Sequence, residues 1–348
     1  MTEQQSTTGQ VATAGGAPPQ SGPDGPAVTD IQTPWLSGDR IAQLGPLLAL
    51  IVACLFFTTQ SDRFLTGTNF SLIVQQVMVI GMLAIGQTLI ILTAGIDLSC
   101  GTVMAFGSIV MTKLAVNSGV SPVLAIILGI AACVAFGALN GTLVSYVKLP
   151  AFIVTLGTFN IAYALTHIYS KDETISNLPS IETKLGNSFN IGSTAITYGM
   201  IVTLAMFGIV WFVLTQTAWG RRVYAMGDNP EATRLMGIPV RRQLLTVYAV
   251  AGLIYGIAAL LLISRTEVGD PNAGFTDNLD AITAVVLGGT SLFGGRGTVI
   301  GTLIGALIVG VLRDGLVLMG VQSIYQTLIT GILVILAVSV DQIARKRV

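Results

Sequence analysis

The feature that most constrains this chain is a succession of apolar segments, each about long enough to cross a membrane. They lie at 41–58, 71–93, 100–116, 122–140, 151–169, 195–217, 243–264, 280–294, 298–313 and 321–340. About 20 apolar residues in a helix cross a hydrocarbon core of about 30 Å. Charged residues make up only 10% of the 348 residues, against about 25% in soluble proteins. We therefore predict an all-α, polytopic transmembrane helix bundle with ten spans.

The eighth segment, 280–294, is short and ends in a glycine cluster at Gly288-Gly289 and Gly294-Gly295. A half-helix or a re-entrant segment is an alternative here. Irregular backbone at membrane depth is tolerated only where protein buries it.

The arginine and lysine residues of the loops predict the orientation. Loop 218–242 carries five arginines against Asp228 and Glu231, whereas loops 170–194 and 265–279 show no basic excess. Because basic residues favour the cytoplasmic side, the first loop is predicted inside and the other two outside. The basic end Arg345-Lys346-Arg347 fits the inside, and ten spans then place both termini in the cytoplasm.

Residues 1–40 differ in composition from the rest of the chain. They hold five of the twelve prolines and no basic residue before Arg40. Such a segment cannot bury enough apolar surface to fold. We predict a disordered cytoplasmic tail over 1–40 and a transmembrane domain over 41–348.

The sequence predicts no enzyme, no cofactor and no metal site in this chain. His167 is its single histidine, and no paired His/Cys metal spacing occurs. The glycine-rich stretch 289–296 lacks the Lys-Ser/Thr pair of a phosphate-binding loop. The formal net charge is +0, so the sequence shows no basic excess of the kind that binds nucleic acid.

Polar side chains inside the apolar segments are candidates for a solute path. They are mostly uncharged; the candidates for the path are Gln75, Gln76, Gln87, Asp97, Ser99, Asn140 and Asn160, and Gln326 is a further amide of this kind. Amides donate and accept hydrogen bonds, which suits sugar hydroxyls. Hydrogen bonding between helices is the alternative explanation for each. For Asp97, capping a helix start competes with direct contact to the solute.

Loop 218–242 also contains the signals of a short helix. Asp228 or Asn229 can cap it, Pro230 suits its first position, and Gly237 suits a left-handed stop. A basic loop needs no such helix for its orientation. A short rigid helix in a cytoplasmic loop is a means of receiving force from a partner protein.

Three passages and this loop resemble the permease subunits of bacterial monosaccharide ABC importers, the ribose/xylose/arabinose/fructose type. The passages are Thr93-Ala94-Gly95-Ile96-Asp97-Leu98-Ser99-Cys100-Gly101, 149–158, and 280–291 with 294–298; the loop matches at Gly227, Asn229, Ala232, Gly237 and Ile238. The likeness runs from about residue 45 to about 340. Ala94 and Cys100 stand where the family usually has Gly and Val.

The resemblance implies a mechanism and partners. Two permease chains, here a homodimer, would line one path through the bacterial cytoplasmic (inner) membrane for a monosaccharide. A separate ABC ATPase subunit would grip the coupling loop at Gly227, Asn229, Ala232 and Gly237, and an extracytoplasmic sugar-binding protein would dock on the outer loops. A secondary carrier of a small polar solute and a membrane scaffold are the alternatives; the uncharged segments disfavour the carrier, which needs a coupling-ion site.

Overall fold

A computed structural model describes the chain over residues 38–345. The helices in chain order are α1 (Gly38–Gln60), α2 (Gly67–Ile91), α3 (Cys100–Val116), α4 (Pro122–Ser145), α5 (Ala151–Ser170), α6 (Ser180–Thr183), the 3-10 turn η1 (Lys184–Gly186), α7 (Tyr198–Gln216), α8 (Ala218–Asp228), α9 (Pro230–Leu235), α10 (Val240–Thr266), α11 (Asp277–Leu287), α12 (Val299–Leu318) and α13 (Ser323–Arg345). Two strands, β1 (Ser188–Ile191) and β2 (Thr194–Thr197), complete the elements. The predicted tail 1–40 lies outside the described residues except for its last three, with which α1 begins.

Each predicted apolar segment coincides with a helix. By length and composition, six helices of the described residues can span a membrane: α2, α4, α5, α7, α10 and α12. Cys100–Val116 and the parts of α1 and α13 over Gly45–Gln60 and Ser323–Leu333 are shorter apolar helices. A polytopic helical membrane protein is therefore correct as a class.

The eighth predicted segment forms the short helix α11. It covers 11 residues, about 16 Å at 1.5 Å per residue, which is half of a hydrocarbon core. The chain then turns through Gly289, Gly294 and Gly295 at φ of 81°, 84° and 71°. Glycine adopts these left-handed values without a steric penalty. The glycine cluster therefore ends the helix, and the short α11 matches the half-helix alternative.

The all-α prediction missed a β-hairpin. Strands β1 and β2 pair antiparallel with Ser188 opposite Thr197 and Ile191 opposite Thr194. The predicted segment 195–217 therefore begins as a strand, and α7 starts at Tyr198. The side chain of Thr197 accepts a hydrogen bond from the backbone N–H of Met200 at 3.3 Å, which caps the helix at this point.

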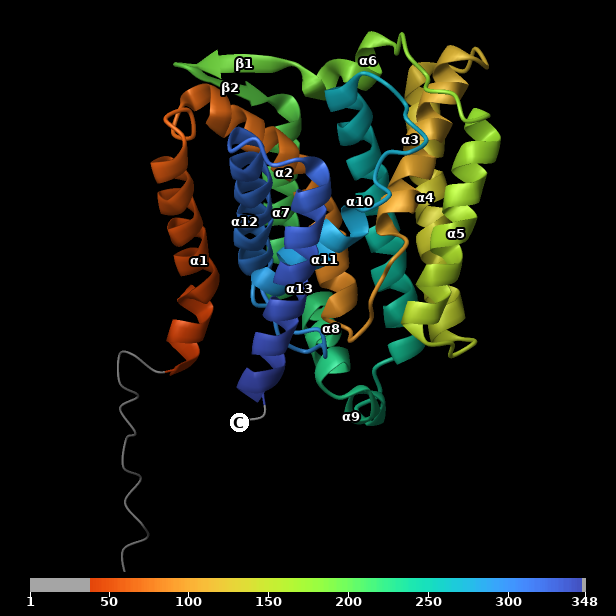
Figure 1. Ribbon diagram of the computed structural model, residues 1–348. Helices are drawn as coiled ribbons and strands as arrows, with labels where there is room; N and C mark the ends of the chain where they lie inside the picture. Colours follow the sequence, from red (N-terminus) through yellow and green to blue (C-terminus); the bar gives the residue numbers. More distant parts are fainter. Residues whose placement is uncertain (1–37, 346–348) are drawn as a thin grey trace, which may run out of the picture. The chain divides into compact units, whose positions relative to one another are not determined.

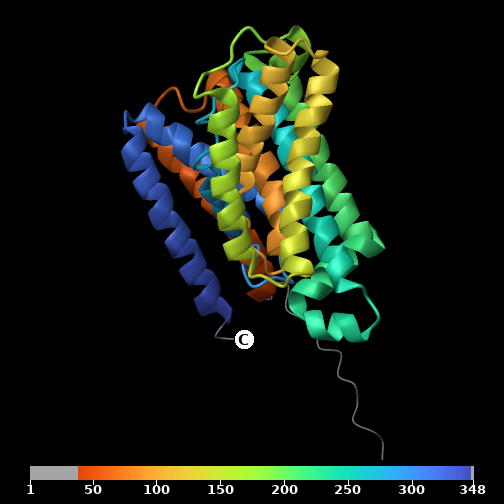
Figure 2. The ribbon, with the colours of Figure 1, turned by 90° about the vertical axis from the view of Figure 1, so that its right-hand side faces the viewer.

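Helices α2 and α10 form the centre of the bundle. In the apolar windows of these two helices 83% and 67% of the residues are buried, against 28% in α4 and α5 and 33% in α7. The outer three therefore leave most of their apolar residues exposed on the outside of the bundle. Figures 1 and 2 show the β-hairpin and α6 at one end of the bundle and α8 and α9 at the other. These are called the hairpin end and the α9 end.

Glycines allow α4 and α10 to pack closely. A Cβ on Gly252 of α10 would lie 2.5 Å from the carbonyl oxygen of Cys133, and one on Gly137 of α4 would lie 2.3 Å from that of Tyr248. Small residues at helix contacts are the usual means of close packing in membranes.

We expect Gly252→Ala to destabilise the bundle by about 1–3 kcal/mol, because the methyl group forces α4 and α10 apart. Thermal unfolding of the purified protein measures the effect. Gly157→Ala on α5 is the control, since nothing lies within 4 Å of its Cβ position and alanine favours a helix by about 1 kcal/mol. Equal unfolding temperatures for the two variants would contradict the packing argument.

Candidate functional site

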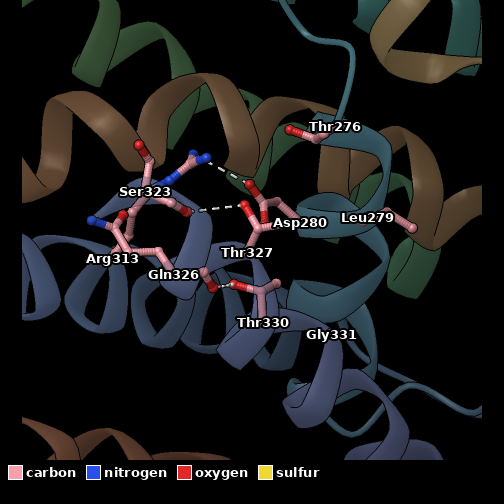
Figure 3. A pocket seen from close by; sticks show the side chains of 9 residues that line it. All are labelled: Thr276, Leu279, Asp280, Arg313, Ser323, Gln326, Thr327, Thr330 and Gly331. Carbon is pink, nitrogen blue, oxygen red and sulfur yellow. Dashed lines mark hydrogen bonds and ion pairs between the residues drawn. The ribbon is translucent and has the colours of Figure 1, made fainter. Parts of the chain in front are cut away.

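A polar cavity lies among α2, α10, α11, α12 and α13. It consists of two adjoining hollows of about 470 Å³ and 350 Å³ that share Arg313 and Gln326. The larger is lined by Leu72, Gln75, Gln76, Val79, Ile80, Arg265, Asp277, Arg313, Val317 and Gln326. The smaller lies between α11 and α13 and is shown in Figure 3. Both volumes fall in the range of small-molecule sites, about 300–1,000 Å³.

An ion pair involves Arg313, which lines both hollows, and Asp280, which lines the smaller one. Arg313 Nη1 lies 3.2 Å from Asp280 Oδ2, and Figure 3 shows the two side chains directed toward one another. The side chain of Asp280 is only 9% exposed, whereas that of Arg313 is 41% exposed. Asp277 interacts electrostatically with both Arg313 and Arg265. The cavity therefore contains two guanidinium groups and two carboxylates.

The sequence found only the amides of this cavity. Gln75 and Gln76 were predicted to line a path, and the structure places both in the larger hollow. The four charged residues were missed as a group. Arg265 and Asp277 fell in a predicted loop but belong to α10 and α11. Arg313 could have indicated the cavity from the sequence, because it lies at the end of the apolar segment 298–313. A charge there is costly unless it has a function or a partner.

Three further candidates, Gln87, Ser99 and Asn140, surround Asp97 at the break between α2 and α3. Asp97 Oδ1 accepts hydrogen bonds from the backbone N–H and the hydroxyl of Ser99 at 2.7 and 2.6 Å. Asn140 Nδ2 donates to the Ser99 hydroxyl at 3.1 Å, and Gln87 Nε2 donates to the Asp97 carbonyl at 2.5 Å. All four are at most 2% exposed. The Asp97 carboxylate thus accepts hydrogen bonds just before the start of α3, but it does not cap that helix, whose N-cap is Ser99.

Asn160 lies apart from these groups. It is exposed on α5, where its Nδ2 donates to the Leu156 carbonyl oxygen at 2.9 Å. The predicted path residues thus divide among the polar cavity, the Asp97 cluster and the surface of α5.

The predicted short helix is confirmed as α9. Asn229 caps it by accepting from the backbone N–H of Ala232 at 2.9 Å, and Pro230 stands at its first turn. Gly237 follows the helix at φ 80°. Thr233 donates to the carbonyl of Ala225 at 2.9 Å, which ties α9 to α8. Local residues therefore fix both ends of this helix.

The surface of α9 exposes both charged and apolar side chains, with Glu231 and Arg234 paired on it. Leu235 and Met236 are 77% and 68% exposed, and Ala232 is exposed beside them. Exposed apolar residues that gather at the end of one short helix are typical of a contact surface for another protein.

Three backbone segments meet where α8 ends, in what we call the glycine junction: Leu92, Ala94, Gly227, Gly294 and Gly295. The backbone N–H of Gly295 donates to the Leu92 carbonyl at 3.0 Å. A Cβ on Gly227 would lie 1.8 Å from that carbonyl oxygen and 2.5 Å from the Gly295 nitrogen. The end of α8 therefore contacts both the α2–α3 break and the loop before α12.

Ala94, which stands where the family usually has glycine, has φ 59°. An L-residue is disfavoured in this left-handed conformation by about 1–2 kcal/mol. This backbone geometry at the junction would suit a glycine at position 94.

Glu182 in α6 is a buried carboxylate at the hairpin end. Neither carboxylate oxygen has a hydrogen-bond partner, and burial raises the pKa of Glu182 from 4.5 to about 7. The folded protein therefore keeps this proton to a higher pH than the unfolded chain. Stability contributed by the neutral carboxyl is present below about pH 4.5 and is lost as pH rises through about 7.

We expect the unfolding temperature to fall by several degrees between about pH 5 and pH 8, and Glu182→Gln to reduce that fall. Thermal unfolding at both pH values, for the original protein and the variant, checks this. An unchanged pH dependence in the variant would assign the effect to other groups.

Among the described residues, 38–345, no three His, Cys, Asp or Glu side chains gather as potential metal ligands. What the described residues offer is a polar cavity within an apolar bundle and a capped, exposed helix at one end. Together these features are those of a membrane transport protein that contacts a partner.

Comparison with known proteins agrees with this class. Residues 69–338 match the family model described as "Branched-chain amino acid transport system / permease component". The fructose import permease protein FrcC of Rhizobium meliloti is 44% identical over 307 residues, covering 86% of this chain and 85% of that protein. The ribose import permease protein RbsC of Bacillus subtilis (strain 168) is 41% identical, covering 86% and 92%.

A more distant relative, the xylose transport system permease protein XylH of Escherichia coli (strain K12), is 32% identical over 360 residues, covering 86% of this chain and 92% of that protein. The chain is thus a multi-pass permease of the bacterial inner membrane. It belongs to the family of monosaccharide ABC import permeases, as the sequence motifs indicated.

Proposed function

We propose that this chain forms the membrane path for a neutral monosaccharide, which a sugar-binding protein delivers and a separate ATPase subunit drives through. The relatives transport fructose, ribose and xylose by their names. One structural observation supports the proposal: the chain combines a cavity whose polar groups suit hydroxyls with a capped helix, α9, that ends in the exposed Leu235 and Met236.

The orientation that we propose places α9 in the cytoplasm and the hairpin end outside, with ten membrane segments and both termini inside. The arginines around α9 favour the cytoplasm. A membrane-impermeant thiol reagent should then label Asn187→Cys in intact cells but not Asp228→Cys, two positions that are both exposed. Labelling of Asp228→Cys alone would reverse the orientation.

The coupling element is α9, with Gly227, Asn229, Ala232 and Gly237 as its functional residues. Asn229 and Gly237 hold the helix in shape, and Ala232 lies on the surface that meets the ATPase. Gly227 connects α8 to the α2–α3 break, so that a shift of α9 reaches the centre of the bundle. This is a rigid-body route for alternating access.

A second copy of this chain completes the path. The polar cavity contains charged side chains in an apolar bundle, and such groups face a protein interior or water, not lipid. A homodimer would cover the cavity from the flank of the bundle. The sugar-binding protein would dock at the hairpin end.

The test is uptake of labelled ribose, xylose, fructose and allose in cells that lack this chain, with and without its restoration together with the partners. We expect uptake of at least one sugar to be restored, to stop on ATP depletion and to persist with an uncoupler. Uptake that instead follows the proton gradient would favour a secondary carrier. The half-buried Asp277 and the buried Asp280 make this control necessary, because a carboxylate inside the bundle could serve a coupling ion.

A further inference from the structure

Four charged side chains inside the bundle are not explained by packing alone. Arg265, Asp277, Asp280 and Arg313 come from three different helices and line the two adjoining hollows. Asp280 is buried, and Arg265 and Asp277 are half-buried. Apolar residues in their place would avoid the cost of removing charges from water. Their presence in a cavity therefore indicates a polar occupant.

The depth of the cavity fits a transported solute. Gln76 lies nine residues after the start of α2 at Gly67, about 14 Å along a helix, near the middle of a core of about 30 Å. Arg313 lies five residues before the end of α12 at Leu318, about 8 Å from the same end. The cavity thus reaches from the hairpin end to about the middle of the membrane.

Several polar atoms in the cavity have unused hydrogen-bonding capacity. Oε1 of Gln76 and Oδ2 of Asp280 are buried and accept no hydrogen bond. For Asp280 the ion pair with Arg313 lies within 3.2 Å but lacks hydrogen-bond geometry. The guanidinium of Arg313 has five N–H donors in a planar fork and remains 41% exposed. A ligand that both donates and accepts can satisfy these groups.

The balance of charges in the cavity favours neutral ligands over anionic ones. The lining contains two arginines and two aspartates, so the formal charges cancel. A phosphate or carboxylate would need an unbalanced positive charge to replace its hydration. A neutral polyol needs none, because each hydroxyl is both a donor and an acceptor.

We propose that Arg265, Asp277, Asp280 and Arg313, with Gln76 and Gln326, form a binding site for a neutral monosaccharide on its way through the membrane, and that their balanced charge excludes acidic sugars. This inference rests on the proposed function and adds the residues that hold the solute and the reason for its neutrality.

Transport by the reconstituted complex of permease, ATPase and sugar-binding protein gives the first test. Asp280→Asn and Arg313→Gln should each lower the rate of labelled ribose, fructose or xylose uptake at least about tenfold, which corresponds to about 1.4 kcal/mol. The control is Asp314→Asn, next to Arg313 but outside the cavity lining. Its amide oxygen can still accept the hydrogen bond that Asp314 receives from Asn69 at 2.8 Å.

Thiol protection gives the second test and does not depend on turnover. Gln76→Cys is made in a Cys54→Ser background, since Cys100 and Cys133 are buried. The transported sugar should slow labelling of this cysteine in the complex at least about threefold, and D-glucuronate should not. In the double variant Gln76→Cys/Asp280→Asn, the cavity lining carries one net positive charge. D-glucuronate should then slow labelling of the cysteine at position 76. If the Arg313–Asp280 ion pair were purely structural, its loss would not change whether the cavity binds a neutral or an acidic sugar. The exposed hairpin variant Phe189→Cys should show no protection.

Equal labelling of Gln76→Cys with and without sugar, or original uptake rates in Asp280→Asn, would overturn the site while leaving the proposed function intact. If the original complex imports none of the four sugars, the proposed function fails instead. The two failures are thus distinguishable.

Discussion

Gly227→Ala is expected to lower sugar uptake at least about tenfold, even though alanine favours a helix over glycine by about 1 kcal/mol. Its methyl carbon would lie 1.8 Å from the Leu92 carbonyl oxygen and 2.5 Å from the Gly295 nitrogen. Neither neighbour is a flexible side chain, so the backbone segments of the glycine junction must separate. The end of α8 would then lose its fixed contact with the α2–α3 break.

The measurement is uptake by the reconstituted complex, together with ATP hydrolysis and co-purification of the ATPase. We expect the ATPase to bind and hydrolyse ATP while transport is lost, because α9 itself is unchanged. Gly208→Ala on α7 is the matched control, since nothing lies within 4 Å of its Cβ position. Uptake at the original rate in Gly227→Ala would show that the junction transmits no force.

Leu235→Glu is expected to prevent association with the ATPase. Leu235 is 77% exposed on α9, so the folded permease tolerates a charge there. A carboxylate buried against an apolar partner surface leaves an unpaired charge, which is strongly unfavourable. Co-purification of the ATPase should fall at least about tenfold, with a normal amount of permease in the membrane.

Two further changes, one in α9 and one just after it, test the surface and the end of this helix. Ala232→Trp adds bulk to the exposed surface, and Gly237→Val places a β-branched residue at φ 80°, which is strongly disfavoured. Both should reduce ATPase binding or ATP-driven uptake. Ile191→Glu at the hairpin end, where the side chain is 61% exposed, should leave ATPase binding intact. If all three α9 variants bind the ATPase and transport normally, α9 is not the coupling element.

Local sequence signals predicted α9 well. Asn229, Pro230 and Gly237 act through bonds and dihedral angles within a few residues of themselves, so their effect does not depend on distant parts of the chain. The hairpin was missed because Thr194–Thr197 continues directly into the apolar α7, and hydropathy does not distinguish a strand from the first turn of a helix.

By itself, the sequence determined the class of protein, the positions of its helices and its family. Apolar length dictates a helix in lipid, since every backbone group must bond within its own segment. Only the tertiary structure decided that Arg265, Asp277, Asp280 and Arg313 share one cavity, that Gln87 belongs with Asp97, and that Gly227 touches Leu92. Those contacts join residues that lie up to 135 positions apart. These contacts depend on how the helices pack against one another. The spacing of residues within a single helix does not determine that packing.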